Sequence, residues 1–396
     1  MMGGREKRKR GNEMTEVSIV GCEDYSPENC DRAIDEVLAP LGGLDWVKKG
    51  MRIVIKANLV SAAKPEKAVT THPQLLASLT RKLVARGASV VVGDSPGNLF
   101  NAAVLNHIYS VTGMHLVEEA GGELNHDFSQ KNAEFPEAHV AKTFAYTGYL
   151  DNADAIISFC KLKSHGMMSL SASTKNFFGS VPGTTKPEYH FRFPDPIDFG
   201  GMIVDLNAYF KPRIFLCDAV EAMEGNGPTA GTPVHMGCLL AATDCSRLDL
   251  ICCRLIGLDP MAVPTLRAAA NFGIIGENAD DIEVAGDVDA FVKPDFQRIE
   301  RGKGMQFENV LPGKFGLALS SVAKAALRSK PKLDKKHCVG CGLCSRICPA
   351  KAITIVDKKA QIDRKKCIRC FCCQEFCPQG AMKVHRPLVA RILNRG

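Results

Sequence analysis

Two copies of one cysteine spacing near the C-terminus constrain what this chain can fold into. Each copy reads Cys-x2-Cys-x2-Cys-x3-Cys-Pro, in residues 338–349 and 367–378. A [4Fe-4S] cubane takes one thiolate per iron, and two-residue gaps let one stretch of backbone present three sulfurs to one cluster. The fourth ligand comes from the other copy in such paired runs, so the spacing predicts two clusters. The expected ligand sets are Cys338, Cys341 and Cys344 with Cys377, and Cys367, Cys370 and Cys373 with Cys348.

Other interpretations of these cysteines explain less. A zinc ribbon uses four ligands and would leave the third cysteine of each run and the trailing Cys-Pro without a role. A disulfide framework requires an oxidising compartment, where 17 cysteines would pair at random. Residues 335–382 resemble a bacterial dicluster ferredoxin. Cys372 breaks the spacing, so we expect a spare thiol that points away from the cluster.

Length and composition allow a large core with a small appended module. The chain has 396 residues, of which 45% are hydrophobic, and no apolar run approaches the roughly 20 residues that span a bilayer. The basic start is not followed by an apolar segment of the kind found in signal peptides. We therefore expect a cytoplasmic protein. The expected organisation is a disordered basic tail (1–14), an α/β domain (15–314), a connector (315–332), a dicluster ferredoxin domain (333–385) and a basic amphipathic tail (386–396).

The formal charge of +7 is distributed unevenly. Residues 331–396 contain fifteen Lys and Arg against four Asp and Glu, so this end carries +11 and residues 1–330 carry −4. Lysines near a cluster offset its negative charge and favour its reduced form. The remaining excess suits an acidic electron donor or acceptor, such as a ferredoxin or a flavodoxin. Nucleic acid is not an expected partner, because no binding motif or interleaved aromatic residues accompany the basic side chains.

Residues 15–310 show the alternation of an α/β fold with a mostly parallel sheet and flanking helices, to which the small α+β ferredoxin domain is added. A buried strand (52–56), a helix that starts at Pro73 (73–86) and a further strand (88–93) predict one βαβ unit. Such units have right-handed crossovers. Further expected strands are 155–160, 213–217 and 238–242, with helices near 197–210 and 246–256.

Polar side chains follow five of the expected strands, at their carboxyl ends. In open α/β sheets this edge forms the ligand crevice. Strand ends are exposed and often carry caps or turn formers, so the prediction depends on the residues as a group. The expected ligand-binding residues from these strand ends are Lys56, Asn58, Asp94, Ser95, Asp218 and Asp244.

The segment 161–190 concentrates polar groups in what reads as a loop-rich region. Its lysines, histidine and amide suit an anionic group such as a carboxylate or a phosphate. No dinucleotide fingerprint, P-loop or Ser-x-x-Lys signature is present. The glycine-rich segment 224–231 is explained equally well as a surface loop or as a close approach of backbone to a ligand. The expected anion-holding residues are Lys161, Lys163, Lys175 and Asn176, with His165 or His72 to move protons.

Several ordered motifs resemble a known family. They are Lys56-Ala57-Asn58-Leu59, Thr70-Thr71-His72-Pro73, Gly93-Asp94-Ser95-Pro96-Gly97, Lys161-x-Lys163-x-His165, Lys175-Asn176-Phe177-Phe178-Gly179 and Asp218-Ala219-Val220 with Gly225-Asn226-Gly227-Pro228. Over about residues 15–310 the chain is similar to the domain-of-unknown-function family 362, whose members often carry a C-terminal dicluster ferredoxin domain. The resemblance implies an iron–sulfur protein of the anaerobic type but no settled reaction. Ala57 stands where a proline is common in the family.

Three function classes follow from these observations. The chain is an iron–sulfur oxidoreductase or reductive maturation factor that delivers low-potential electrons to an anionic ligand in the crevice. Alternatively, it is an electron or iron–sulfur carrier whose α/β domain is a non-catalytic docking platform. A non-redox ligand-binding protein with structural clusters is the third class. The orientation of the clusters distinguishes the first two, because an enzyme needs one cluster close to the crevice.

Overall fold

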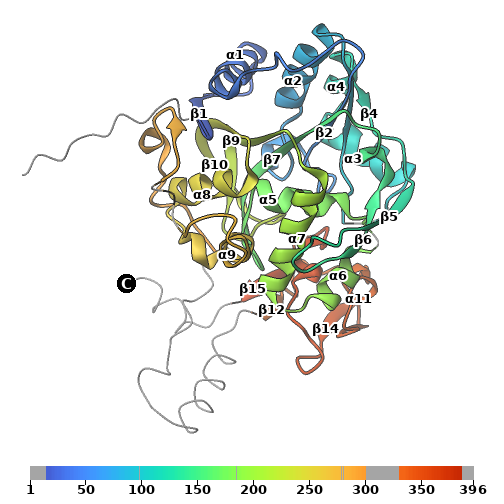
Figure 1. The fold of residues 1–396 in the computed structure, drawn as a ribbon. Helices are drawn as coiled ribbons and strands as arrows, with labels where there is room; N and C mark the ends of the chain where they lie inside the picture. Colours follow the sequence, from blue (N-terminus) through green and yellow to red (C-terminus); the bar gives the residue numbers. More distant parts are fainter. Residues whose placement is uncertain are drawn as a thin grey trace, which may run out of the picture.

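The computed structural model describes residues 15–299, apart from 98, 184, 278 and 280, and residues 330–385. The expected tails (1–14 and 386–396) and most of the expected connector (315–329) lie outside the described residues. Within the described part, an α/β domain carries a central sheet, and a small strand-rich module lies beside it (Figure 1). No helix in this part of the chain has the length and apolar character needed to cross a bilayer.

The central sheet is mostly parallel, as the sequence predicts. Its order is β11-β1-β10-β9-β7-β2-β3-β4, with β8 paired to β7. Neighbours from β9 to β4 run parallel, whereas β10 is antiparallel to both β9 and β1. The strands are β1 (Val17–Gly21), β2 (Arg52–Lys56), β3 (Ser89–Gly93), β4 (Glu123–Leu124), β7 (Ala155–His165), β8 (Ser169–Ser171), β9 (Ile214–Glu224), β10 (Thr232–Ala242) and β11 (Val284–Ala285).

Strands in the middle of the sheet are buried on both faces, because successive side chains point to opposite sides. On β9, Leu216 belongs to one buried core cluster and its neighbour Cys217 to the other. Helices α1 and α2 contribute to the first cluster, and α8 and α9 to the second. The helices are α1 (Pro27–Leu38), α2 (Pro73–Ala85), α3 (Ala102–Thr112), α4 (His115–Glu119), α5 (Ser173–Asn176), α6 (Lys186–Arg192), α7 (Pro196–Phe210), α8 (Cys245–Leu255) and α9 (Pro264–Asn271). A separate hairpin joins β5 (Gln130–Glu134) and β6 (Thr143–Thr147).

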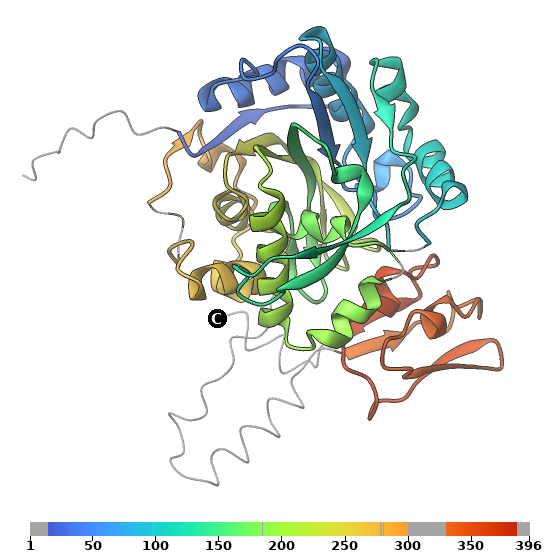
Figure 2. The same ribbon diagram turned by 45° about the vertical axis from the view of Figure 1, so that its right-hand side comes forward.

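The C-terminal module consists of two small sheets and two short helices. Strand β12 (Lys330–Leu333) pairs with β15 (Met382–His385), and β13 (Ile353–Val356) pairs with β14 (Lys359–Ile362). The helices α11 (Leu343–Arg346) and α12 (Cys372–Glu375) each lie inside one cysteine run. The module lies next to α6 in both ribbon views (Figures 1 and 2). Its first strand includes Pro331, which the sequence analysis assigned to the connector.

Every strand and helix expected from the sequence is present, and three strands are longer than expected. Strand β7 continues to His165, so Lys161, Lys163 and His165 lie on a strand and not in a loop. Strand β9 continues to Glu224 and β10 begins at Thr232. This extension brings Lys161 and Lys163 into register beside β9, whereas His165 pairs with Ser169 of β8.

Candidate functional site

The candidate site lies at the carboxyl edge of the parallel strands. Lys56 ends β2, Asp94 follows β3, and Lys161 on β7 is the direct cross-strand partner of Asp218 on β9. Because these four strands are mutually parallel, their carboxyl ends meet at one edge. All four side chains are buried. Four of the predicted site residues are therefore brought together as expected.

Two buried ion pairs occupy this edge. The Nζ atom of Lys161 lies 2.8 Å from Asp218 Oδ2, and that of Lys56 lies 2.7 Å from Asp94 Oδ1. Burial lowers the pKa of Lys56, an effect that the nearby charge of Asp94 opposes. A Cβ atom at Gly179 would overlap both Lys56 and Asp94, which explains the glycine there. These two lysines therefore have resident counter-ions.

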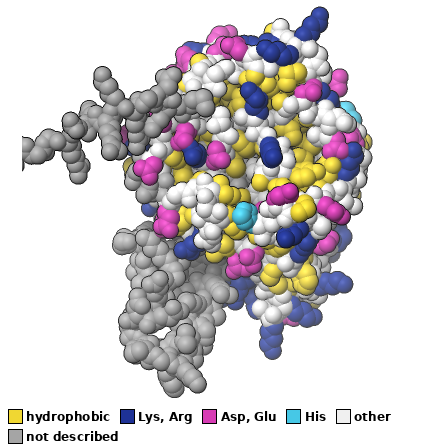
Figure 3. All heavy atoms as spheres, viewed as in Figure 1, with side chains coloured by type: hydrophobic (Ala, Val, Ile, Leu, Met, Phe, Trp, Pro, Cys, Tyr) yellow, Lys and Arg dark blue, Asp and Glu magenta, His cyan; other side chains and the backbone are white. Residues whose placement is uncertain are grey.

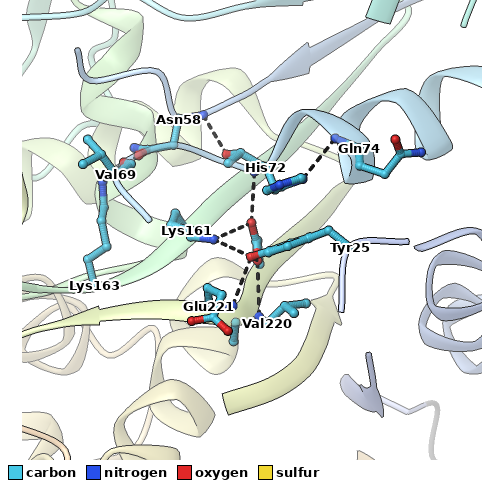
Figure 4. Close-up of polar contacts among 12 residues, drawn as sticks. Tyr25, Asn58, Val69, His72, Gln74, Lys161, Lys163, Val220 and Glu221 are labelled. Carbon is cyan, nitrogen blue, oxygen red and sulfur yellow. Dashed lines mark hydrogen bonds and ion pairs between the residues drawn. The ribbon is translucent and has the colours of Figure 1, made fainter. Parts of the chain in front are cut away.

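Tyr25 and His72 surround the carboxylate of Asp218 (Figure 4). The Tyr25 hydroxyl donates to Asp218 Oδ1 at 2.9 Å and accepts from Lys161 Nζ at 2.7 Å, while the backbone N–H of His72 donates to Oδ2 at 3.0 Å. The two rings stack with centroids 3.6 Å apart. Burial lowers the pKa of His72 to about 4. Its Nδ1 atom accepts from the N–H of Gln74 and so caps α2.

Lys163 differs from these lysines because it has only neutral partners among the described residues. Its Nζ atom donates to Asn58 Oδ1 at 2.7 Å and to the Val69 carbonyl at 2.8 Å (Figure 4). The side chain is fully buried, and burial lowers the pKa of Lys163 to about 7, helped by the charge of Lys175. Lys163 is thus an ammonium close to its titration point, with no carboxylate beside it.

Asn176 connects the lysines at this edge. Its Oδ1 atom accepts from Lys56 Nζ at 3.1 Å and from Asn58 Nδ2 at 3.2 Å, and its Nδ2 atom donates to Ser158 Oγ at 3.0 Å. Ser95 lies beside this network, and its hydroxyl has no partner among the described residues. Asn58, Asn176 and Ser95 therefore lie where the sequence analysis expects them.

A second group of ionisable residues lies where the α/β domain meets the module. We call it the interface cluster: His165, Lys175, Lys186, His190 and Glu375. Lys175 and Lys186 place their Nζ atoms 5.8 and 5.7 Å from the centroid of the Phe178 ring. Lys186 also donates to the carbonyls of Ser95 and Pro96.

Two histidines in the interface cluster are buried and neutral. Burial lowers the pKa of His165 to about 4 and that of His190 to about 3. The Nδ1 atom of His165 accepts from two backbone N–H groups, those of Met167 and Met168, at 3.1 Å each. Its proton therefore sits on Nε2, which faces Glu375 Oε2 at 3.8 Å.

Glu375 belongs to the module, on α12, between two cysteines of the second run. Burial would raise the pKa of its carboxyl, but the charge of Lys175 and the imidazole of His165 lower it below its usual value. Glu375 is the residue that sequence reasoning missed most completely, because its neighbours lie about 200 positions earlier in the chain.

The module packs on the glycine-rich loop of residues 224–231. Gln374 Nε2 donates to the carbonyls of Asn226 and Gly227, both at 3.1 Å, and Thr229 Oγ1 donates to the Glu375 carbonyl at 3.2 Å. A Cβ atom at Gly97 would overlap the ring of Phe376. This loop, which the sequence left equally open to two explanations, therefore contacts the second cysteine run.

The eight run cysteines line two cavities in the module. One, the outer cysteine cavity, is lined by Cys338, Cys341, Cys344 and Cys377. The other, the inner cysteine cavity, is lined by Cys348, Cys367, Cys370 and Cys373. Each cavity takes three cysteines from one run and one from the other, the sorting that the sequence predicts. Among the described residues, no group of three His, Cys, Asp or Glu side chains is arranged so that it could hold a single metal ion.

The two cavities differ in their surroundings. In the outer cavity Cys341 is exposed and Val339 is 60% exposed. In the inner cavity Cys373 is 7% exposed, and Phe371 packs into the core cluster of the α/β domain. The inner cavity therefore shares a wall with the α/β domain. Cys372 also lines it, fully buried, so the expected outward turn of its thiol stays a prediction.

Asp244 does not reach the site, contrary to expectation. Strand β10 is antiparallel to β9, and Ala242 pairs with Phe215 near the start of β9. The carboxyl end of β10 is therefore at the opposite edge of the sheet from Asp218. Asp244 accepts from the N–H groups of Ser246 and Arg247 at 2.9 Å each and caps α8.

Two family models match the chain. One, described as domain of unknown function (DUF362), matches residues 53–254, and the other, described as a 4Fe-4S dicluster domain, matches residues 330–378. A thylakoid-associated protein of Synechocystis sp. (strain ATCC 27184 / PCC 6803 / Kazusa) is 29% identical over 265 residues, which cover 65% of this chain and 79% of the relative.

Two solved structures are similar at low identity. The lactate racemase apoprotein from Thermoanaerobacterium thermosaccharolyticum is 11% identical, with a TM-score of 0.39, over 59% of this chain and 55% of that one. A protein from Thermotoga maritima is 11% identical, with a TM-score of 0.35, over 55% of this chain and 56% of that one. The chain thus spans about half the length of these two structures.

Proposed function

We propose a function for this chain from two premises: it belongs to the family described as domain of unknown function DUF362, and its C-terminal module is a 4Fe-4S dicluster domain. It is an iron–sulfur electron-transfer protein of a reducing, cytoplasmic compartment. It binds two [4Fe-4S] clusters and serves a redox reaction on an anionic ligand in the α/β crevice. When bound, the clusters would supply one-electron transfer at low potential.

The cysteines of the module fit this cofactor. Each cavity offers the four thiols expected from the spacing, to which the inner one adds Cys372, and each iron of a cubane takes one thiol. The backbone N–H groups of Ala352 and Ala381 lie 3.2 and 3.3 Å from Cys348 Sγ and Cys377 Sγ. Such N–H···S contacts stabilise the negative charge that ligating thiolates carry. We therefore assign the outer and inner cysteine cavities to one cluster each.

The observation that carries the proposal is the position of the inner cysteine cavity. Helix α12 supplies Cys373 to this cavity and Glu375 to the interface cluster, so the two sites share one helix of four residues. Phe371, from the wall of the same cavity, packs into the α/β core. An oxidoreductase needs a redox centre close to its ligand, and this arrangement supports that function over a carrier with an inert docking domain.

The outer cysteine cavity suits contact with a protein partner. Its lining includes the exposed Val339, and Lys335, Lys336 and Lys358 are exposed nearby in the chain. Figure 3 shows Lys and Arg side chains projecting from the lower part of the molecule, where the module lies. Opposite charge steers encounters between redox proteins. We propose an acidic electron-transfer protein, of the ferredoxin or flavodoxin type, as donor or acceptor there.

The crevice residues divide into a framework and a ligand-binding set. Lys56 and Lys161 have carboxylate counter-ions and, with Asn58, Asp94, Asn176 and Asp218, form the framework. Lys163 and Lys175 have no ion pair with a carboxylate in the described part of the chain. We therefore place them in the ligand-binding set, where they would bind the anion. His165 carries a proton on Nε2 and is placed to donate a hydrogen bond through it, whereas His72 uses Nδ1 as a cap.

The test uses the full-length protein purified without oxygen. Small molecules that co-purify are identified by mass spectrometry, and the dithionite-reduced protein is mixed with each while the electron paramagnetic resonance signal of the clusters is followed. We expect one of these molecules to reoxidise the clusters of the wild type. Lys163→Met should abolish that reoxidation and keep its iron, whereas the matched variant Lys142→Met, at an exposed lysine of the α/β domain, should behave as wild type.

The carrier alternative gives a different result. If the clusters reoxidise with an acceptor protein alone, and Lys163→Met transfers electrons as fast as the wild type, the α/β domain is a docking platform. Protein that holds stoichiometric zinc after isolation without oxygen would overturn the iron–sulfur assignment itself.

A further inference from the structure

The interface cluster contains more cationic and proton-donating groups than acceptors. It brings together two lysines and two histidines with a single carboxylate, that of Glu375. Asp94 also acts on Lys186, but Asp94 already forms the 2.7 Å ion pair with Lys56. Lys175 has an aromatic neighbour, Phe178, and no ion pair among the described residues.

The Glu375 carboxylate makes no close contact with the cationic and N–H groups of the interface cluster. Its closest ion-pair contact is the 3.8 Å approach to His165 Nε2, which is longer than a hydrogen bond. His165 Nε2 and His190 Nδ1 are buried nitrogens without a hydrogen-bond partner in the described part of the protein, and so is the hydroxyl oxygen of Ser95, whose carbonyl accepts from Lys186. Buried polar atoms are normally satisfied, so a group of them at one place indicates a ligand that is bound there.

The chemistry of the cluster selects the kind of ligand. Lysine ammonium groups and an imidazole N–H donate hydrogen bonds and attract negative charge, so the complementary group is an oxyanion with several acceptor oxygens. A carboxylate or a phosphate has this character. Glu375, the only member with that chemistry, is supplied by the module and not by the crevice.

We propose that the interface cluster is an oxyanion-binding site and that the Glu375 carboxylate is its resident counter-ion, which the ligand displaces. The inference rests on the proposed function, since the ligand is the anion proposed for the crevice. Displacement requires rotation of one side chain, because the hydrogen bonds that seat α12 come from Gln374 and from the Glu375 carbonyl and leave the carboxylate free to move. The lysines of the site therefore face a negative charge both with and without the ligand.

The test measures binding in the holo-protein with oxidised clusters, so it needs no turnover. Inorganic phosphate and acetate are titrated separately by calorimetry, which distinguishes the two oxyanion types. Glu375→Gln should bind at least one of them at least tenfold more tightly than the wild type, since no internal anion competes. Asp357→Asn removes the same charge from an exposed turn of the same module and should leave the affinity unchanged. Adding Lys175→Met to Glu375→Gln should abolish the gain.

The outcomes separate this inference from the proposed function. If Glu375→Gln binds neither anion more tightly, or if Asp357→Asn gives the same gain, Glu375 is not a resident counter-ion. Failure of ligand-dependent reoxidation with the predicted binding intact would remove the proposed function and leave the oxyanion site standing.

A second test uses the wild-type protein, so that its result does not depend on whether a variant keeps its iron. When the Glu375 carboxylate is displaced, its attraction to the cationic groups of the interface cluster is lost. Saturating phosphate or acetate should therefore increase hydrogen–deuterium exchange in the segment 371–377. Unchanged or slower exchange there with both anions bound would overturn the displacement.

Discussion

The hydroxyl of Tyr25 and the Nζ atom of Lys161 lie 2.7 Å apart, although the residues are 136 positions apart in the chain. Tyr25 follows β1, and Lys161 lies on β7, three strands away across the sheet. The contact adds a third element to the Lys161–Asp218 ion pair. It therefore fixes the loop before α1 to the edge where the proposed ligand binds.

The first prediction concerns this contact. Tyr25→Phe removes the acceptor of Lys161 Nζ and of the Glu221 N–H and the donor to Asp218. Leaving buried partners unsatisfied costs about 1–3 kcal/mol, so the midpoint of thermal unfolding should fall. The stack on His72 should survive, and the iron content should stay that of wild type. An unchanged midpoint would show that water replaces the hydroxyl.

The second prediction compares two neighbouring lysines of β7. Lys161→Met leaves the buried carboxylate of Asp218 without its counter-ion, which costs about 3–5 kcal/mol. Lys163→Met removes a lysine with neutral partners only and leaves two buried acceptors unsatisfied, at a cost of about 1–3 kcal/mol. Denaturant unfolding of both variants measures the difference. The double variant Lys161→Met/Asp218→Leu should recover only part of the loss, because the Tyr25 hydroxyl and the His72 N–H then lose their acceptor. Equal costs for the two single variants would contradict the division into framework and ligand-binding residues.

The third prediction concerns iron content. Wild-type protein isolated without oxygen should contain about eight irons and eight sulfides per chain. Cys372→Ala should leave this count unchanged. Cys348→Ser removes one ligand of the inner cysteine cavity and should lower the count toward about four. Colorimetric iron and sulfide assays measure both results, and loss of iron in Cys372→Ala would make that residue a ligand.

The fourth prediction concerns pH. Burial lowers the pKa of Lys186 to about 7, so its ammonium is present below pH 7 and is lost as the pH rises through it. His165 and His190, with lowered pKa values, stay neutral from pH 6 to 8. The charged groups acting on Lys186 are Asp94, Lys56, Glu375 and Lys175.

Sulfate is a suitable probe for this effect because it does not titrate between pH 6 and 8. Its affinity for the Glu375→Gln protein should fall roughly tenfold over that range, as the fraction of protonated Lys186 falls. Lys186→Met should flatten the profile. A profile that keeps its full slope in Lys186→Met would assign the titration to another group, with Lys163 as the first to examine.

The sequence predicts the framework of the site well and its relation to the module poorly. Strands such as β2 and helix α2 are recognisable because apolar runs and a leading Pro73 are local signals. Lys56 and Asp94 follow from the parallel strands that they end. Strand direction is not local, since an antiparallel β10 has the same apolar pattern as a parallel one, and Asp244 was misplaced for that reason.

Tyr25 and Glu375 could not be placed from the sequence. Strand β1 is short and was not predicted, so nothing located Tyr25 at the sheet edge. Glu375 reaches the interface cluster through packing of the module on the loop 225–228, a contact between segments about 150 positions apart. Such long-range packing depends on the shape of both surfaces, and neither surface has a periodic signal.

The unequal exposure of the two cysteine cavities has a consequence for the order in which oxygen damages this protein. Oxidants reach exposed thiolates before buried ones, and Cys341 is exposed whereas Cys373 is 7% exposed. Aerobic damage should therefore begin at the outer cavity and leave the inner one intact for longer. A partly oxidised chain would keep the proposed redox centre beside its crevice but lose the one proposed to exchange electrons with other proteins, so electron supply would fail before the ligand site does.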